Sequence, residues 1–213
     1  MKTDQLIAWL AADATAVAPR VWRVRYAAAL GIGLIGAVAL MLTLLGVRPD
    51  IAEAARLPMF WVKLAFPLTL AGAAVLAVVR LSLPGVPLGR VPSALAAPVL
   101  VMWLLSAVVL SGAAPDERSA LLFGETWAEC PVYVTILSLP ALVALLWVMK
   151  TLAPTQPVWA GAAAGLLAGA LGATVYALHC PEMDAPFLGA WYLLGMLIPA
   201  TLGAVAGPRL LRW

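Results

Sequence analysis

Six apolar stretches, each long enough to cross a lipid bilayer, limit what this chain can fold into. They lie at 26–46, 59–79, 92–111, 131–150, 157–178 and 187–207. A bilayer core about 30 Å thick requires roughly 20 apolar residues per helix. Because lipid offers no partners to backbone polar groups, each stretch is expected to be helical. The sequence therefore predicts an all-α membrane protein, with a bundle of six transmembrane helices over 26–213.

Composition supports this class and excludes others. Of the 213 residues, 64% are apolar and 11% are charged, whereas soluble domains carry about 25% charged residues. A soluble hydrolase or nucleotide-binding domain is therefore excluded. The G-x-G-x-x-G match at 31–36 lies inside an apolar stretch, so we interpret its glycines as helix-packing residues.

The basic residues predict the orientation of the chain. With the N-terminus in the cytoplasm, nine fall on the inner side: Lys2, Arg20, Arg23, Arg25, Arg80, Arg90, Lys150, Arg209 and Arg212. Three fall on the outer side: Arg48, Arg56 and Arg118. Positive charge concentrates in cytoplasmic loops, so we expect a multi-pass protein of the bacterial inner membrane with both termini cytoplasmic. Lys63, near the outer end of the second stretch, is expected to snorkel to the interface.

Glycines repeat every four residues in the fifth stretch, at Gly161, Gly165 and Gly169. This spacing makes a smooth ridge that another helix can approach closely. The ridge could join two copies into a homo-oligomer, but with five other helices available, packing within the bundle is favoured.

The segment 1–25 is predicted to be cytoplasmic and to contain a short amphipathic helix. Leu6 and Leu10 share one helical stripe with Ile7 beside it, and Asp4 and Asp13 add polar groups elsewhere. Such a helix can lie on the membrane or dock onto a protein partner. Because the segment has acids and no base between positions 2 and 20, a protein partner is favoured.

The two cysteines share one local pattern. Cys130 and Cys180 each precede a proline near a glutamate, and the predicted topology places both at the outer face, where disulfides are permitted. They could form a structural disulfide if their Cα atoms lie about 4.4–6.8 Å apart. Alternatively they act as a sensor that oxidises, or that transiently binds a soft metal ion with His179. Glu129 and Glu182 could add oxygen ligands, although acids beside a thiol oppose thiolate formation. The residues alone leave both interpretations open.

Several motifs occur together along the chain. They are MKTDQLIAWLAAD at the start, GVRPDI, FWVKLAF, ECP at 129–131, PTQPVWAGAAAGLLAGALGATVYALHCPE at 154–182 and GPRLLRW at the end. In this combination the chain resembles the NrsF-type membrane anti-sigma factors. The resemblance covers nearly the whole chain and is weakest over 80–125.

The resemblance implies a six-span inner-membrane protein that restrains an extracytoplasmic-function sigma factor. It further implies that Cys130 and Cys180 form a periplasmic pair that senses heavy metals or oxidants. The sigma contact is expected in the N-terminal segment, at Asp4, Leu6, Ile7, Leu10 and Asp13. The expected partners are therefore the sigma factor and the bilayer, with no enzymatic activity, no required cofactor and no direct contact with nucleic acid.

Two other classes of function fit a small membrane protein. A small-solute or metal-ion transporter or channel usually carries ionisable groups at mid-membrane, and no such group falls near the middle of any stretch. A membrane thiol oxidoreductase would be favoured by a CxxC motif, which the chain lacks. Both therefore rank below the anti-sigma function.

Overall fold

A computed structural model describes residues 3, 5, 9, 19–152 and 154–212. Their helices are α2 (Pro19–Leu44), α3 (Ile51–Ala54), α4 (Pro58–Ser82), α5 (Val91–Gly112), α6 (Glu117–Phe123), α7 (Cys130–Lys150), α8 (Pro157–Tyr176), α9 (Ala185–Phe187) and α10 (Leu193–Leu210). A π-helical turn, Leu188–Tyr192, joins α9 to α10. No strand occurs in this part of the chain.

Within the part of the chain that the structure describes, six helical segments are long and apolar enough to span a membrane: Trp22–Leu44, Pro58–Ser82, Val91–Gly112, Cys130–Lys150, Pro157–Tyr176 and Ala185–Leu210. The prediction of an all-α bundle of six spans is therefore confirmed. The largest difference is at the first span, where α2 begins at Pro19 instead of residue 26. Proline suits the first position of a helix, and the basic residues that follow it extend α2 beyond the apolar run.

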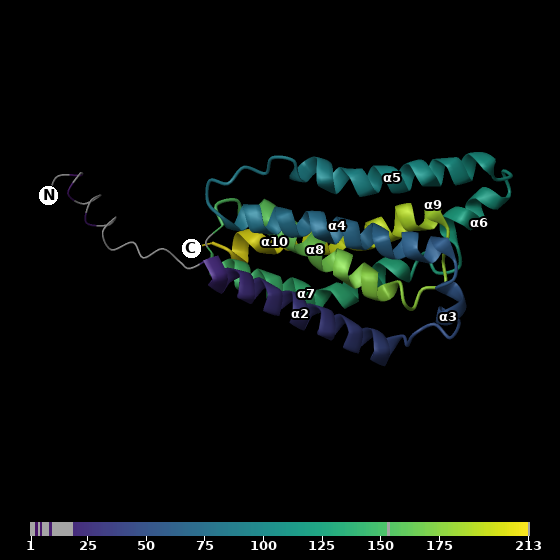
Figure 1. Ribbon diagram of the computed structural model, residues 1–213, viewed down its shortest axis with the longest axis horizontal. Coiled ribbons are helices and arrows are strands. Elements are labelled where there is room, and N and C mark those ends of the chain that lie inside the picture. Colours follow the sequence, from purple (N-terminus) through teal and green to yellow (C-terminus); the bar gives the residue numbers. More distant parts are fainter. Residues whose placement is uncertain (1–2, 4, 6–8, 10–18, 153, 213) are drawn as a thin grey trace.

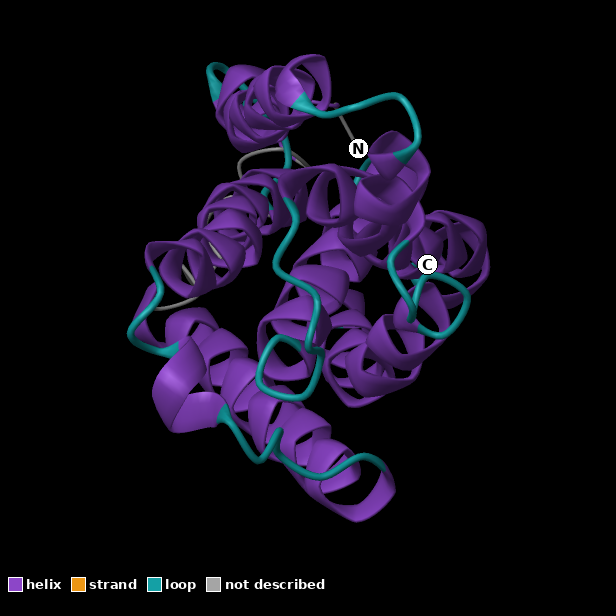
Figure 2. Cartoon of the chain, turned by 90° about the vertical axis from the view of Figure 1, so that its right-hand side faces the viewer, coloured by secondary structure: helices purple, strands orange, loops and turns teal. Residues whose placement is uncertain are grey.

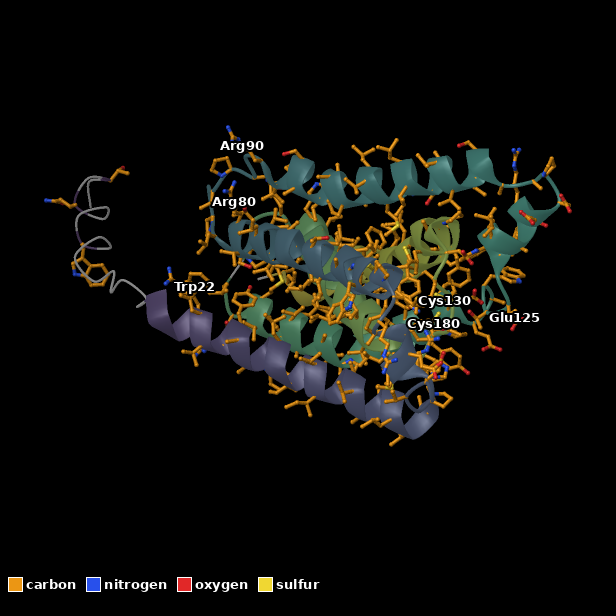
Figure 3. All side chains as sticks on the ribbon, turned by 45° about the vertical axis from the view of Figure 1, so that its right-hand side comes forward. Trp22, Arg80, Arg90, Glu125, Cys130 and Cys180 are labelled. Carbon is orange, nitrogen blue, oxygen red and sulfur yellow. The ribbon has the colours of Figure 1, made fainter. Side chains whose placement is uncertain are left out.

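The long helices run back and forth between two ends of the bundle (Figure 1). We call the end where α2, α5 and α8 begin the proximal face, and the end where α4, α7 and α9 begin the distal face. Arg80 and Arg90 lie at the proximal face, whereas Glu125 lies at the distal face (Figure 3). The basic and acidic residues that the sequence assigns to opposite sides of the membrane thus lie at opposite ends of the bundle.

Helix α8 lies at the centre of the bundle, where 67% of the residues in its most apolar 18-residue stretch are buried by the rest of the protein. Its glycines bring its backbone against that of α10. A Cβ atom added at Gly161 would lie 2.0 Å from the carbonyl oxygen of Gly203, and one at Gly165 would lie 2.0 Å from that of Pro199. No side chain fits there, so the prediction that these glycines pack within the bundle is confirmed.

Helices α2 and α5 lie at opposite edges of the bundle, as the end-on view in Figure 2 shows. Helix α2 packs on α7, where Gly33 lies against Ala141 and Gly36 lies against Pro140. No atom lies within 4 Å of a Cβ added at Gly31. The prediction that this glycine serves helix packing is therefore wrong. Helix α5 is the least buried span, at 6% of its window.

The central helix contact can be tested with two glycine variants. Gly165→Ala is expected to destabilise the protein by about 1–3 kcal/mol or more, because a new methyl group must push two backbones apart. Gly72→Ala, in α4, is the control, since nothing lies within 4 Å of its added Cβ. The midpoint of unfolding in mixed detergent micelles measures both variants. Equal midpoints for the two would contradict this account of the α8–α10 contact.

Candidate functional site

A short turn after α8 carries Cys180 at the distal face. The amides of His179 and Cys180 still donate to the carbonyl of Tyr176, at 2.9 and 3.0 Å, and Pro181 then prevents a further helical turn. We call residues 179–182 the Cys180 turn. The thiol of Cys180 is fully buried below it.

Cys130, the first residue of α7, is also fully buried. Both sulfurs are free thiols, and the two residues lie at the same end of the bundle (Figure 3). The structure thus brings together the two cysteines that the sequence placed at one face. Neither sulfur contacts solvent, so a reagent must open the Cys180 turn to reach them.

Two buried tyrosines flank the thiols. The rings of Tyr176 and Tyr192 have centroids 5.8 Å apart, and both side chains are almost completely buried. The Tyr192 hydroxyl lies beside the Cys180 thiol and has no nitrogen or oxygen partner among the described residues. The thiol is therefore the polar group next to this buried hydroxyl.

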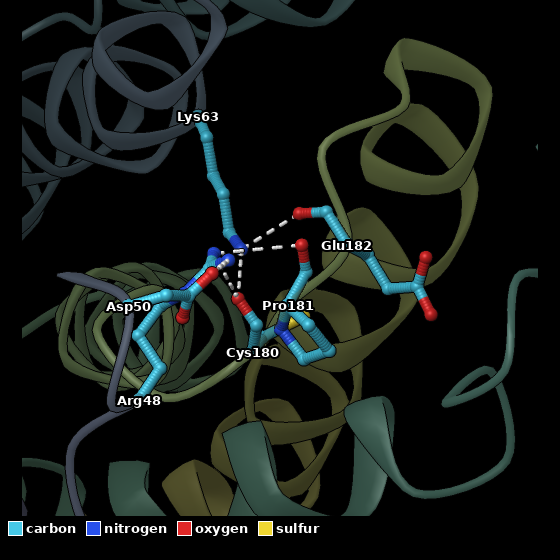
Figure 4. Close-up of polar contacts among 6 residues, drawn as sticks. All are labelled: Arg48, Asp50, Lys63, Cys180, Pro181 and Glu182. Carbon is cyan, nitrogen blue, oxygen red and sulfur yellow. Dashed lines mark hydrogen bonds and ion pairs between the residues drawn. The ribbon is translucent and has the colours of Figure 1, made fainter. Parts of the chain in front are cut away.

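Lys63 of α4 holds the Cys180 turn from inside the protein. Its Nζ donates to the carbonyl oxygens of Cys180 at 2.6 Å and Glu182 at 2.7 Å (Figure 4), and it lies 5.7 Å from the centroid of the Tyr192 ring. The expectation that Lys63 snorkels to the lipid interface is wrong. The side chain is fully buried, because its ammonium binds carbonyls of the turn inside the protein.

Arg48 binds the same turn from the segment that follows α2. Its Nη1 donates to the carbonyls of Cys180 and Pro181 at 3.3 and 3.4 Å. Its Nε and Nη2 bind the Asp50 carboxylate at 2.7 and 2.6 Å. These hydrogen bonds lower the pKa of Asp50 and raise that of Arg48. Asp50 therefore stays ionised and offsets the positive charge that Arg48 brings near Lys63 (Figure 4).

The remaining predicted ligands point to other partners. His179 Nδ1 lies 2.9 Å from the carbonyl oxygen of Gly46. The Glu182 carboxylate accepts hydrogen bonds from the amides of Glu125 at 2.8 Å and Thr126 at 3.3 Å, and Glu129 is exposed. Within 19–152 and 154–212, no three His, Cys, Asp or Glu side chains are arranged to hold a metal ion. The metal site therefore stays a prediction that requires the turn to rearrange.

The predicted sigma-factor contact residues lie outside the described residues. They are Asp4, Leu6, Ile7, Leu10 and Asp13. Their role stays a prediction.

Sequence reasoning missed the cations and tyrosines of this site. Lys63 carried the strongest available signal, since an ionisable residue in an apolar span is a functional candidate by default. Arg48, Tyr176 and Tyr192 had no comparable signal, because their roles depend on partners far away in the chain.

Comparison with known proteins places this architecture in a family. The model of the NrsF family, described as a negative regulator of sigma F, matches residues 10–213. The chain belongs to the NrsF family. It is 55% identical over 213 residues to a probable anti-sigma-F factor NrsF of Azospira oryzae. It is 41% identical over 215 residues to the anti-sigma-F factor NrsF of Caulobacter vibrioides.

Both NrsF relatives align over their full lengths and over the full length of this chain. By name they are regulators and not enzymes. No solved structure matches the chain at a significant level.

The role of Lys63 in covering Cys180 can be tested by thiol labelling. Lys63→Met leaves the Glu182 carbonyl without its donor and the Cys180 carbonyl with only the longer bond from Arg48. A lost hydrogen bond of this kind costs about 1–3 kcal/mol, so the turn should open more often. We expect Cys180 to react several-fold faster with a small maleimide, measured in a Cys130→Ser background. Arg118→Met, which removes an exposed cation from the distal face, should leave the rate unchanged. An unaltered rate in the Lys63 variant would show that the ammonium does not hold the turn closed.

Proposed function

We propose that this chain is an anti-sigma factor of the inner membrane that sequesters an extracytoplasmic-function sigma factor at its proximal, cytoplasmic face. The observation that carries the proposal is the full-length similarity to anti-sigma-F factors. The concentration of basic residues at the proximal face supports the orientation. The six apolar spans support retention in the membrane.

The N-terminal segment is the proposed contact for the sigma factor. The connections between spans at the proximal face are short, at 83–90 and 151–156, so 1–18 is the longest segment available there. Its pattern of Leu6, Ile7 and Leu10 suits docking into an apolar groove. Trp9 is 70% exposed, and tryptophan is enriched among residues that dominate protein interfaces.

Cys130 and Cys180 are the proposed sensor on the periplasmic side. An oxidant would take two electrons from the two thiols, which lose two protons and join as a disulfide. A soft metal ion would instead bind both sulfurs as thiolates. Because both thiols are buried, either reaction requires the Cys180 turn to open. The new bonds to sulfur would then hold the turn in a different arrangement. A signal of this kind acts by its different affinity for the two arrangements.

Helix α2 is the proposed connection between the sensor and the N-terminal segment. Its distal end is bonded to the Cys180 turn through His179 and the carbonyl of Gly46. The Arg48 amide also donates to Leu178 at 3.2 Å. Its proximal end, Pro19, directly follows the N-terminal segment. A rearranged turn would therefore alter bonds at one end of the helix whose other end carries the sigma contact.

The sensor can be tested with a sigma-dependent reporter in the native host. With Cys130 and Cys180 replaced by Ser, we expect induction by cadmium or chromate to be lost, because neither thiolate ligation nor disulfide formation remains possible. Ser119→Ala, at an exposed position of α6, is the control. Membrane levels of each variant are compared by immunoblot. An inducible response that survives both replacements would remove the cysteines from the mechanism.

The sigma contact can be tested by co-purification. Leu6→Asp combined with Leu10→Asp should abolish retention of the sigma factor, because two charges would interrupt the apolar stripe. Thr15→Asp, which adds a charge off the stripe, should retain it. A chain without residues 2–18 should behave like the double variant. If it binds the sigma factor undiminished, the contact lies elsewhere.

A further inference from the structure

An apolar groove runs along α5 and is not explained by the proposed function. One part of it, about 490 Å³, lies between the distal half of α5 and the segment 186–197. The other, about 380 Å³, lies between the proximal half of α5 and helices α4, α8 and α10. Trp103, Leu193 and Leu197 line both parts, so they form one continuous groove, which we call the α5 groove.

The α5 groove has the length of a membrane leaflet pair. Its lining on α5 extends from Pro92 to Leu110, which at about 1.5 Å per residue is roughly 27 Å. The hydrocarbon core of a bilayer is about 30 Å thick. The proximal part of the groove, from Pro92 to Trp103 on α5, is roughly 16 Å long and so matches one leaflet of the bilayer.

The lining of the α5 groove leaves no polar atom for water or a polar ligand. Its hydroxyl, Ser106 Oγ, already bonds the carbonyls of Met102 at 2.7 Å and Ala185 at 2.8 Å. Its indole N–H, on Trp103, donates to the carbonyl of Gly189 at 3.0 Å. Because these groups are satisfied within the protein, hydrocarbon is the chemistry that fits the groove.

Two arginines lie at the proximal end of the groove. Arg90 is exposed immediately before α5. Arg80 reaches the same connection, where its Nη1 donates to the carbonyls of Pro87 and Leu88 beside Gly89. Among the described residues, neither arginine forms an ion pair with a carboxylate. Figure 3 shows both at the same end of the bundle. Basic sites between transmembrane helices at the cytoplasmic side bind anionic lipid head groups.

We propose that an anionic phospholipid binds along the proximal half of α5, with its acyl chains in the proximal part of the α5 groove as far as Trp103 and its phosphate at Arg80 and Arg90. Charge complementarity favours this occupant over a second copy of the chain, which would bring two further arginines to the same place. The lipid supplies the packing that α5 lacks, since only Val91, Met102 and Ser106 of this helix are buried by protein. The site is separate from the Cys180 turn and does not depend on the sigma factor.

Native mass spectrometry of the purified, delipidated full-length protein tests this site. The protein is offered equal amounts of phosphatidylglycerol and phosphatidylcholine with identical acyl chains. Two arginines facing one head group should give phosphatidylglycerol a preference of about tenfold. Arg80→Gln combined with Arg90→Gln should remove the preference. Arg56→Gln combined with Arg118→Gln, the same charge change at the distal face, should preserve it.

A fluorescence measurement places the acyl chains. Phosphatidylglycerol with brominated chains should quench the protein less when Trp103 is replaced by Phe, because this indole lines both parts of the groove. Val99→Trp, which fills the groove from α5, should lower the occupancy of both lipids. Equal binding of the two lipids, a preference that survives loss of both proximal arginines, or a stable dimer that covers α5 in place of lipid would each overturn the proposal.

Discussion

The backbone contact between α8 and α10 is the constraint on which the rest of the bundle depends. Inside a membrane, helices gain little from the hydrophobic effect and associate through close packing. A Cβ atom added at Gly161 would lie 2.0 Å from the carbonyl oxygen of Gly203, and one added at Gly203 would lie 2.1 Å from that of Gly161. Once α8 is held this way, α7, α4 and α2 also pack against it. The end of α8, with Cys180, therefore lies in the middle of the distal face.

This central position explains why cations lie inside the protein. The chain leaves the helix at the Cys180 turn, so the carbonyls of residues 180–182 have no helical donors, and that of the buried Cys180 lies away from bulk water. Lys63 and Arg48 supply the missing donors at the Cys180 turn. Their long side chains reach the turn from α4 and from the segment after α2. Both cations therefore bind the turn that carries the buried Cys180 thiol.

Much of the fold could be predicted from the sequence, because membrane spans depend on local length and apolarity. The six spans and the glycine ridge of α8 are of this kind. The short helices α3 and α6 and the π-helical turn could not be predicted, since a few residues carry no periodic signal. Within the site, the sequence showed that both cysteines belong to one face. It could not show the bond from Lys63 to Cys180, whose residues lie 117 positions apart, nor the burial that this bond produces.

The share of buried residues in each membrane-spanning stretch decreases from the centre of the bundle to its edges. It is 67% for α8, 22% for α2 and 6% for α5. Moving α8 would break backbone contacts with α10, so a change at the Cys180 turn meets least resistance at an edge helix. Of the two edge helices, α2 is the one whose following segment binds the turn, through the carbonyl of Gly46 and the side chain of Arg48. It also packs on α7 beside an apolar hollow of about 890 Å³, which leaves room for a shift. The packing that makes α8 the fixed element thus makes α2 the element best placed to respond.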